Sequence, residues 1–328
     1  MSVPYTDSKE FFIGGEWVLP SQGYEPILNP ATEEIIGEAP LAGRSEVDQA
    51  LKAARNAFDE GPWPTLPVEA RIEAIRRFRA AIVKRESLIQ QLLIAEVGAA
   101  QLLMNSAQYK GALEAIDYAI RLAQRLEPES VAIELKPNPF DPGAGELLGS
   151  GVVVQEPYGV VVGITPYNYP FLLNVVKAVP ALLTGNTVVL KPSQFTPFSG
   201  LLLNEIIVEA GLPAGVLSVI NGGPEVGAIL TEDPRVDLVT FTGSDKVGQA
   251  ILRQSASTLK KVHLELGGKS ALIVRHDADV MKAAATAAFS LSLHAGQGCA
   301  LLTRYLVHNS IRSAFVEAVK GMLGHLKP

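Results

Sequence analysis

Residues 159–191 decide the fold, and they read GVVVGITPYNYPFLLNVVKAVPALLTGNTVVLK. Residues 159–164 form an unbroken apolar run that predicts a buried strand, and residues 187–190 predict a second strand. Between them, residues 169–183 predict a helix, because Pro170 suits a first helical turn. Apolar strands on either side of a helix are typical of a βαβ crossover with parallel strands.

The alternation of strand and helix continues downstream. Helices are predicted over residues 200–210, 225–231 and 246–255, and strands over residues 216–220 and 238–241. This pattern predicts one parallel sheet with helices on both faces. Such sheets bind ligands beyond the carboxyl ends of their strands, so the residues after each strand are the candidate site.

The segments outside this sheet have a different character. Residues 68–97 and 100–126 predict two long amphipathic helices with solvated charged faces. Residues 131–135 and 152–155 predict a two-stranded ribbon, which is marginal alone, so we expect it to pack on another subunit or domain.

The last part of the chain predicts a second, thinner unit. Its expected strands are residues 270–274 and 304–308, and its expected helices are residues 280–294 and 311–325. Two strands and two helices make a small core, so we expect sequence to be missing from this unit.

Composition limits the class of protein. The net charge of -6 argues against a nucleic-acid partner or an anionic membrane. No apolar run is long enough to span a bilayer, and residues 1–10 lack the pattern of a secretory signal. A single cysteine cannot form an internal disulfide or a Cys-based zinc site, and it fits a reducing cytoplasm. We therefore expect a cytoplasmic protein without a metal.

Polar motifs follow three of the predicted strands. Asn168 follows the strand predicted over residues 159–164. Lys191 begins a Lys-Pro-Ser-Gln turn after the strand over residues 187–190, and Gly243 and Ser244 follow the strand over residues 238–241. Alone, each has a simpler interpretation as a helix cap, a solvated loop or a turn. Small residues at a strand-to-helix turn let a pyrophosphate approach backbone amides, although the GxGxxG pattern is absent. Three such motifs at one sheet edge favour a ligand site.

Glu265 is the candidate general base. It lies between Leu264 and Leu266, so we expect it to be buried, which favours the neutral form of a carboxyl group and suits a general base. The alternative is a buried Glu that pairs with a Lys or Arg.

Cys299 is the candidate nucleophile. Glycines on both sides of Gln297 open space beside the thiol, and backbone amides directed at the sulfur would make it reactive. The alternative is a small buried hydrophobe, which a lone cysteine often is. We interpret His294 as structural and expect His263 to face away, which leaves Glu265 as the base.

These motifs closely resemble those of the aldehyde dehydrogenase superfamily. The resemblance begins at residues 14–17 (Gly-Gly-Glu-Trp) and 29–32 (Asn-Pro-Ala-Thr), and it is densest over residues 159–299. It implies an oxidoreductase that converts an aldehyde to a carboxylic acid with NAD or NADP through a cysteine thiohemiacetal and thioester. Homo-oligomers, either dimers or tetramers, are implied as well.

The resemblance also implies an α/β domain plan. A Rossmann-like parallel-sheet cofactor domain would comprise residues 1–128 and 157–266. Residues 129–156 would form the bridging β-ribbon for oligomerisation, and residues 267–328 the N-terminal part of an incomplete α/β catalytic domain.

Roles carry over to the matching residues. Cys299 would attack the aldehyde, Asn168 would hold the oxyanion and Glu265 would activate water. Lys191 would be one of the catalytic residues and would also contact the ribose of the cofactor. The residues implied in cofactor binding are Thr165, Pro166, Tyr167, Lys191, Ser193, Gln194, Gly223, Gly227, Phe241, Gly243, Ser244, Val247, Leu266 and Gly267.

Two departures from the family pattern matter. Many NAD-selective relatives carry Glu where this chain has Gln194, and Gln does not repel a 2′-phosphate, so NADP stays open. Relatives also continue well past Pro328, so a truncated, inactive nucleotide-binding or scaffold protein is the alternative. Relatives that transfer the acyl group to coenzyme A typically lack a Glu at position 265, so Glu265 favours hydrolysis.

Overall fold

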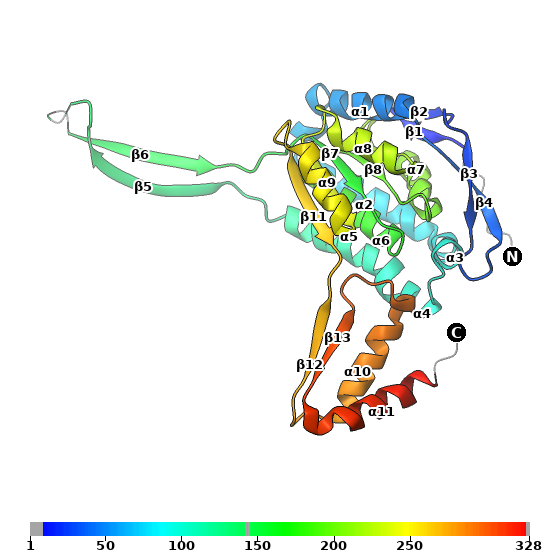
Figure 1. The fold of residues 1–328 in the computed structure, drawn as a ribbon. Helices are drawn as coiled ribbons and strands as arrows, with labels where there is room; N and C mark the ends of the chain where they lie inside the picture. The colour runs from blue at the N-terminus through cyan, green and yellow to red at the C-terminus, as the bar shows by residue number, and fades with distance from the viewer. Residues whose placement is uncertain (1–8, 142, 144, 326–328) are drawn as a thin grey trace.

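The computed structural model describes residues 9–141, 143 and 145–325, and its centre is a five-stranded parallel sheet (Figure 1). The strand order is β11-β10-β7-β8-β9, and every neighbouring pair is parallel. The strands are β7 (Val160–Ile164), β8 (Thr187–Lys191), β9 (Leu217–Val219), β10 (Leu238–Gly243) and β11 (Lys261–Leu266). The parallel α/β sheet that the sequence predicts is therefore confirmed.

Helices cover both faces of this sheet, so its central strands are buried (Figure 1). One group of helices comprises α1 (Arg44–Asp59), α8 (Pro224–Glu232) and α9 (Asp245–Ser255). The other comprises α2 (Val68–Lys84), α3 (Glu86–Val97), α5 (Tyr109–Ala123), α6 (Pro170–Leu183) and α7 (Phe198–Ala210). Because burial on both faces demands apolar side chains throughout, residues 160–162 and 188–190 are continuous apolar runs.

Three predicted helices differ from the observed ones. The helix expected over residues 68–97 breaks at Arg85 (φ -105°, ψ 16°), whose guanidinium donates to the Ala81 carbonyl and pairs with Glu209 on α7. The helix expected over residues 100–126 begins instead with α4 (Gln101–Leu103) and a π-helical turn, Met104–Gln108. The spacing of apolar residues does not reveal tertiary contacts or the extra residue of a π turn, so neither break could be predicted from the sequence.

The third difference is at the end of α10 (Val280–Ser292). The helix was expected to reach His294, but His294 and Ala295 adopt left-handed conformations with φ of 53° and 52°. Non-glycine residues rarely adopt this conformation, so the surrounding packing must hold them there.

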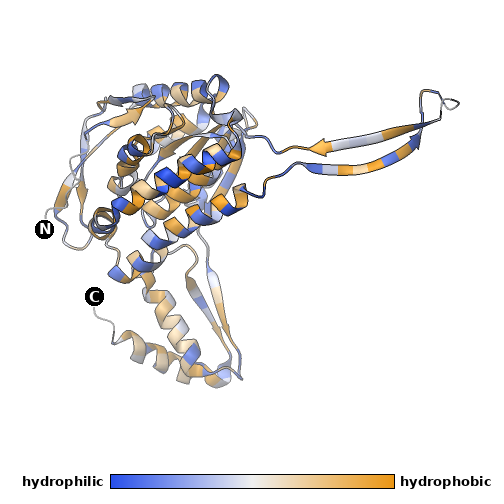
Figure 2. Cartoon of the chain, turned by 180° about the vertical axis from the view of Figure 1, so that it is seen from behind, coloured by the Kyte–Doolittle hydropathy of each residue, from blue (hydrophilic) through white to orange (hydrophobic). Residues whose placement is uncertain are grey.

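A two-stranded antiparallel ribbon projects from the body of the molecule (Figure 1). It is formed by β5 (Glu129–Pro137) and β6 (Glu146–Val153), and all of its residues are exposed. Both strands are longer than the sequence pattern predicts. Apolar segments run along the ribbon (Figure 2), including Ile133 and Leu148, which are 70% and 65% exposed.

The C-terminal unit has a core of its own. Its parallel strands β12 (Ser270–Val274) and β13 (Leu302–Val307) lie beside α10 and α11 (Arg312–Leu323). Only Val274, Ala284, Ala287 and Phe315 are fully buried in this cluster. The thin core expected from the sequence is present in the part of the chain that the structure describes.

Short antiparallel hairpins precede the first helix. They pair β1 (Phe11–Ile13) with β2 (Glu16–Val18), and β3 (Tyr24–Leu28) with β4 (Ile35–Pro40). The segment in which no secretory signal is expected, residues 1–10, lies outside the described residues except for its last two.

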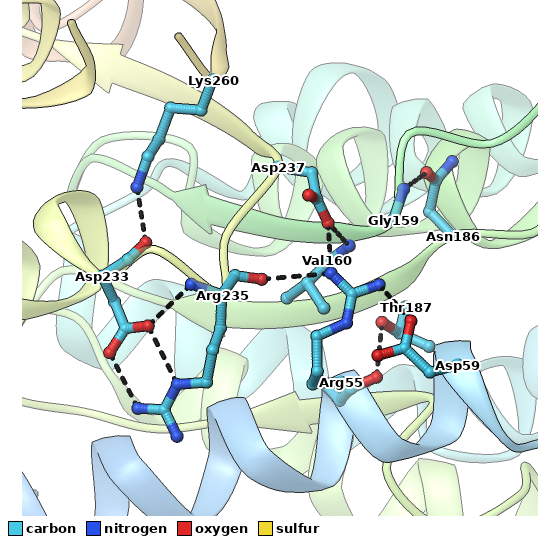
Figure 3. A network of polar contacts seen from close by, with 11 residues as sticks. Arg55, Asp59, Gly159, Val160, Asn186, Thr187, Asp233, Arg235, Asp237 and Lys260 are labelled. Atoms are coloured by element: carbon cyan, nitrogen blue, oxygen red, sulfur yellow. Dashed lines mark hydrogen bonds and ion pairs between the residues drawn. The ribbon is translucent and has the colours of Figure 1, made fainter. Parts of the chain in front are cut away.

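The amino edge of the sheet is held by a polar network (Figure 3). Asp237 Oδ2 accepts hydrogen bonds at 2.7 Å from both Arg55 Nη1 and the main-chain N–H of Val160. Gly159 has φ of 135°, and a Cβ atom there would lie 1.9 Å from the same oxygen. The polar groups at this edge therefore bind one another.

Candidate active site

A cavity of about 1210 Å³ runs along the face of the sheet beneath α6 and reaches the carboxyl edge. It is bounded by β10 and β11, by α6 along most of its length and by the loop before β13, and it extends to Tyr158, Asn186 and Leu238 at the amino ends of the strands. The structure brings Cys299, Glu265 and Asn168 together in its wall. The predicted cofactor residues that also line it are Pro166, Tyr167, Gly243, Ser244, Leu266 and Gly267.

Asn168 is the most firmly held of the three. It follows β7, is 8% exposed, and donates from Nδ2 to the main-chain carbonyl of Gln297 at 2.5 Å. Its own main-chain carbonyl accepts hydrogen bonds from Gln108 Nε2 at 2.8 Å and His294 Nε2 at 2.6 Å. The side-chain amide therefore lies beside the loop that carries Cys299, and one amide hydrogen stays available to a ligand.

His294 explains part of this arrangement. Its ring is buried and packs against Tyr169 with centroids 4.8 Å apart. The left-handed backbone at residues 294 and 295 turns the chain from α10 into the Cys299 loop. The interpretation of His294 as structural agrees with these contacts.

Cys299 is exposed, so the interpretation as a small buried hydrophobe is wrong. The thiol lies on the cavity wall with Gln297, Gly298 and Tyr169. Burial, with a smaller effect from the negative charge of a Cys299 thiolate, raises the pKa of Tyr169. An accessible thiol in a cavity can reach a substrate carbonyl.

Glu265 differs from the prediction, because its side chain is 65% exposed rather than buried. Side chains alternate along a strand, so Leu264 and Leu266 point toward α9, where a Cβ on Gly248 would touch both. Glu265 points the other way, into the cavity. The flanking leucines report the burial of the opposite face of β11 and not that of the carboxylate.

His263 also differs from the prediction that it faces away. It lies two residues before Glu265 on β11, so both side chains share one face of the strand. Its ring lines the same cavity, with Nε2 3.5 Å from Glu265 Oε1.

Lys177 is a cavity residue that the sequence interpretation missed. It lies on α6, is 7% exposed, and donates from Nζ to Thr240 Oγ1 at 2.9 Å. Burial lowers its pKa to about 8, and the negative charge of Glu265 partly opposes this. A lysine within a largely apolar helix was the available signal, since such helices place a lysine inside only against a partner.

Lys191 was also expected among the catalytic residues, but it does not line the cavity that contains Cys299, Glu265 and Asn168. It ends β8, is 6% exposed, and donates from Nζ to the Pro192 carbonyl at 3.3 Å. A Cβ on Gly227 would touch its side chain at 3.9 Å. Burial lowers the pKa of Lys191 to about 8, opposed by Glu225. The structure therefore places Lys191 at the end of β8, which β7 separates from β10, and near α8.

The remaining predicted cofactor residues lie along the same sheet edge but outside the cavity wall. Thr165 donates its hydroxyl to Asn174 Oδ1 at 2.8 Å, and Phe241 is 6% exposed. The main-chain N–H of Val247 is capped by Ser244 Oγ at 3.3 Å. The others are Ser193, Gln194, Gly223 and Gly227, which belong to the turns around Lys191 and the start of α8.

Two further kinds of site are absent from the described ranges. No helix there combines the length and apolar character needed to cross a membrane. No group of three or more His, Cys, Asp or Glu side chains is placed to hold a metal ion in that part of the chain.

Comparison with known proteins gives one family throughout. The profile of the "Aldehyde dehydrogenase family" matches residues 17–327. A 3-succinoylsemialdehyde-pyridine dehydrogenase of Pseudomonas sp is 39% identical, covering 92% of this chain and 60% of that protein. Betaine aldehyde dehydrogenase 1 of Oryza sativa subsp. japonica is also 39% identical, covering 93% and 60%.

Solved structures agree with the sequence comparisons. The Mycobacterium tuberculosis aldehyde dehydrogenase complexed with NAD+ superposes with a TM-score of 0.87 at 39% identity, covering 97% of this chain and 64% of that one. An aldehyde dehydrogenase of Bacillus cereus in complex with NAD+ gives 0.90 at 32% identity, covering 98% and 64%. The chain thus spans about 60% of the length of the curated relatives named above.

Proposed function

The chain belongs to the aldehyde dehydrogenase family, and from this premise we propose that its cavity oxidises an aldehyde to a carboxylic acid with NAD or NADP. One observation carries the proposal: an accessible thiol, a carboxylate and a side-chain amide from three distant parts of the chain meet in one cavity. The family's chemistry needs a nucleophile, a base and an oxyanion donor, and these three groups supply them.

The first half of the proposed reaction uses Cys299 and Asn168. The thiolate Sγ attacks the aldehyde carbonyl carbon, and the carbonyl electron pair moves to oxygen to give a thiohemiacetal oxyanion. Asn168 Nδ2, held beside the Gln297 carbonyl, donates to that oxygen. A nicotinamide cofactor, when bound, supplies the hydride acceptor that turns this adduct into a thioester.

The second half uses Glu265. Its carboxylate takes a proton from a water molecule, whose oxygen attacks the thioester carbonyl. The C–S bond then breaks, which releases the carboxylic acid and returns the thiolate of Cys299. Exposure of Glu265 to the cavity supports this role, because a base for water must itself reach water.

The residues at the sheet edge fit a dinucleotide. Thr242 Oγ1 is buried in the cavity wall without a hydrogen-bond partner among the described residues. Ser244 begins α9, whose amino end favours phosphate, and a Cβ on Gly267 would meet nothing within 4 Å. Lys191 and Gln194 would meet the ribose. Gln194 carries no charge to repel a 2′-phosphate, so the proposal includes both cofactors.

Two expectations from the sequence stand as part of the proposal. The exposed apolar ribbon supports a homo-oligomer, because such a surface is unfavourable in water unless another chain covers it. The single cysteine supports a reducing compartment such as the cytoplasm.

The second candidate function is a nucleotide-binding or scaffold protein of the same family that catalyses no reaction. The hydroxyl of Thr242, unpartnered within the part of the chain that the structure describes, and the amino end of α9 favour it, because they can hold a nucleotide without any chemistry at Cys299. It predicts that the folded chain binds NAD or NADP in calorimetry yet oxidises no aldehyde.

Cofactor reduction by purified protein tests the leading proposal. We expect aldehyde to produce reduced cofactor, with Cys299→Ala silent and Glu265→Gln limited to a burst of one reduced cofactor per chain. The burst is expected because Glu265→Gln blocks only the attack of water. Glu265→Gln that turns over at the wild-type rate would contradict the role given to the carboxylate.

A further inference from the structure

A chain of polar side chains crosses the floor of the cavity and ends on Glu265. Lys177 Nζ on α6 donates to Thr240 Oγ1 on β10 at 2.9 Å. The same oxygen lies 3.2 Å from His263 Nδ1 on β11, and His263 Nε2 lies 3.5 Å from Glu265 Oε1. Three secondary-structure elements therefore contribute to a single line of contacts.

The chemistry of these groups fixes the direction of the hydrogen bonds. Ionised Glu265 can only accept, so a neutral His263 ring must carry its hydrogen on Nε2 to bind it. Nδ1 then accepts, and the hydroxyl of Thr240 is the donor that faces it. The ammonium of Lys177 can only donate, and it fills an acceptor site on the Thr240 oxygen.

We infer that His263 is the positioning residue of Glu265: through Nε2–H it holds one carboxylate oxygen, with its tautomer set by Thr240 and Lys177. The inference rests on the proposed function, because it assigns His263 to the step in which Glu265 activates water. Oε1 lies 3.5 Å from the ring nitrogen, so Oε2 is the oxygen left to face the water. Without this contact the exposed carboxylate rotates freely. It is then a poorer base, because it spends less time oriented toward the water.

The environment of the ring supports this assignment. The side chain of His263 is exposed on the cavity side, so its ring can turn toward Glu265 without breaking contacts with other side chains. Burial lowers the pKa of Lys177 to about 8. The other titratable residues that line the cavity with His263 are Tyr158, Tyr167, Tyr169, Glu265 and Cys299.

Two substitutions of His263 separate positioning from packing. In His263→Gln the amide nitrogen can take the place of Nε2 and still donate to Glu265. In His263→Asn the shorter amide reaches only the place of Nδ1 and Thr240. Both variants keep the groups that attack the aldehyde, so both should keep the burst of reduced cofactor.

The two variants should differ in steady turnover. We expect His263→Gln to stay within a few-fold of wild type, and His263→Asn to lose roughly 10- to 100-fold, because the base is no longer aimed. Thr240→Val should show a smaller loss in the same direction. Equal steady-state rates in His263→Gln and His263→Asn would overturn the inference, because simple packing treats them alike.

A second measurement does not need activity. Imidazole ¹⁵N NMR of the full chain, with the His263 signals identified by their loss in His263→Gln, reports the tautomer directly. We expect the Nε2–H form in wild type. An Nδ1–H ring contradicts the inference. Absence of any aldehyde-dependent cofactor reduction by wild type contradicts only the proposed function, since the tautomer is still measured.

Discussion

The carboxylate of Glu96 lies buried beneath the first turn of α7. Its two oxygens accept hydrogen bonds from the main-chain N–H groups of Phe198 at 2.7 Å and Ser199 at 3.0 Å. Burial raises the pKa of Glu96 to about 7, and the bonds to Ser199 and Phe198 oppose this. Glu96 thus satisfies N–H groups that a helix start leaves without partners, although loss of water makes its charge costly.

This carboxyl group makes stability depend on pH. The folded chain holds the Glu96 proton to a higher pH than the unfolded chain, where the ordinary value is 4.5. Its contribution to the free energy of unfolding is therefore complete below about 4.5 and is lost as pH rises through about 7. We expect urea unfolding of wild type and Glu96→Gln to show this difference, because Gln has no proton to lose. Parallel pH curves for the two proteins would contradict it.

The sequence predicts which residues gather at the site better than it predicts their surroundings. Asn168 follows from its place after a predicted strand, because carboxyl ends of parallel strands share one edge. Cys299 and Glu265 follow from their flanking glycines and leucines together with the resemblance to the family. The prediction that Glu265 is buried was wrong, because the residues next to it along the strand lie on the opposite face of the sheet. Lys177 and Gln108 reach the site through the packing of α6 and of a π-helical turn, which no local pattern encodes.

The start of β7 shows why an element needs a particular residue. Gly159 combines φ of 135° with contact to the Asp237 carboxylate, which binds Arg55 and the first N–H of the strand. A side chain at position 159 would displace that carboxylate and leave the N–H of Val160 without its partner.

Alanine at this position tests the importance of the network. We expect Gly159→Ala to lower the free energy of unfolding by about 3 kcal/mol, from backbone strain and the broken contacts. Gly211→Ala is the matched control: φ is 65°, but a Cβ meets nothing within 4 Å. It should cost only about 1 kcal/mol. Equal losses in urea unfolding would show that the Asp237 contact contributes nothing.

Elements follow from the sequence where one local period decides them. The buried strands β7 and β8 and the helix between them were predictable, since unbroken apolar runs have few alternatives in a covered sheet. The break at Arg85 was not, because it depends on Glu209, a residue far away in the chain. The left-handed turn at His294 was hidden for the same reason, because Asn168 holds that ring.

At the scale of the whole molecule, the ribbon of β5 and β6 is an exposed surface that carries apolar side chains. Leu135 and Leu148 face each other across its two strands. They are 62% and 65% exposed. If this surface meets another copy, replacing both should weaken association while the ribbon itself survives. Leu135→Lys combined with Leu148→Glu keeps a favourable cross-strand pair and removes the apolar face.

Sedimentation measures the effect on self-association. We expect the double variant to shift toward monomer and Leu19→Asp, an exposed leucine outside the ribbon, to behave as wild type. Association that the ribbon substitutions leave unchanged would place the oligomer contact on another surface.

The central claim is that Cys299 and Glu265 act on one substrate in one cavity. Peptide mass analysis of Glu265→Gln after incubation with aldehyde and NAD+ tests it most directly, because the thioester should persist when water is not activated. We predict that the Cys299 peptide gains the mass of the acyl group, and that the wild-type peptide does not accumulate it. An unmodified Cys299 in Glu265→Gln, under conditions where wild type produces acid, would contradict the account.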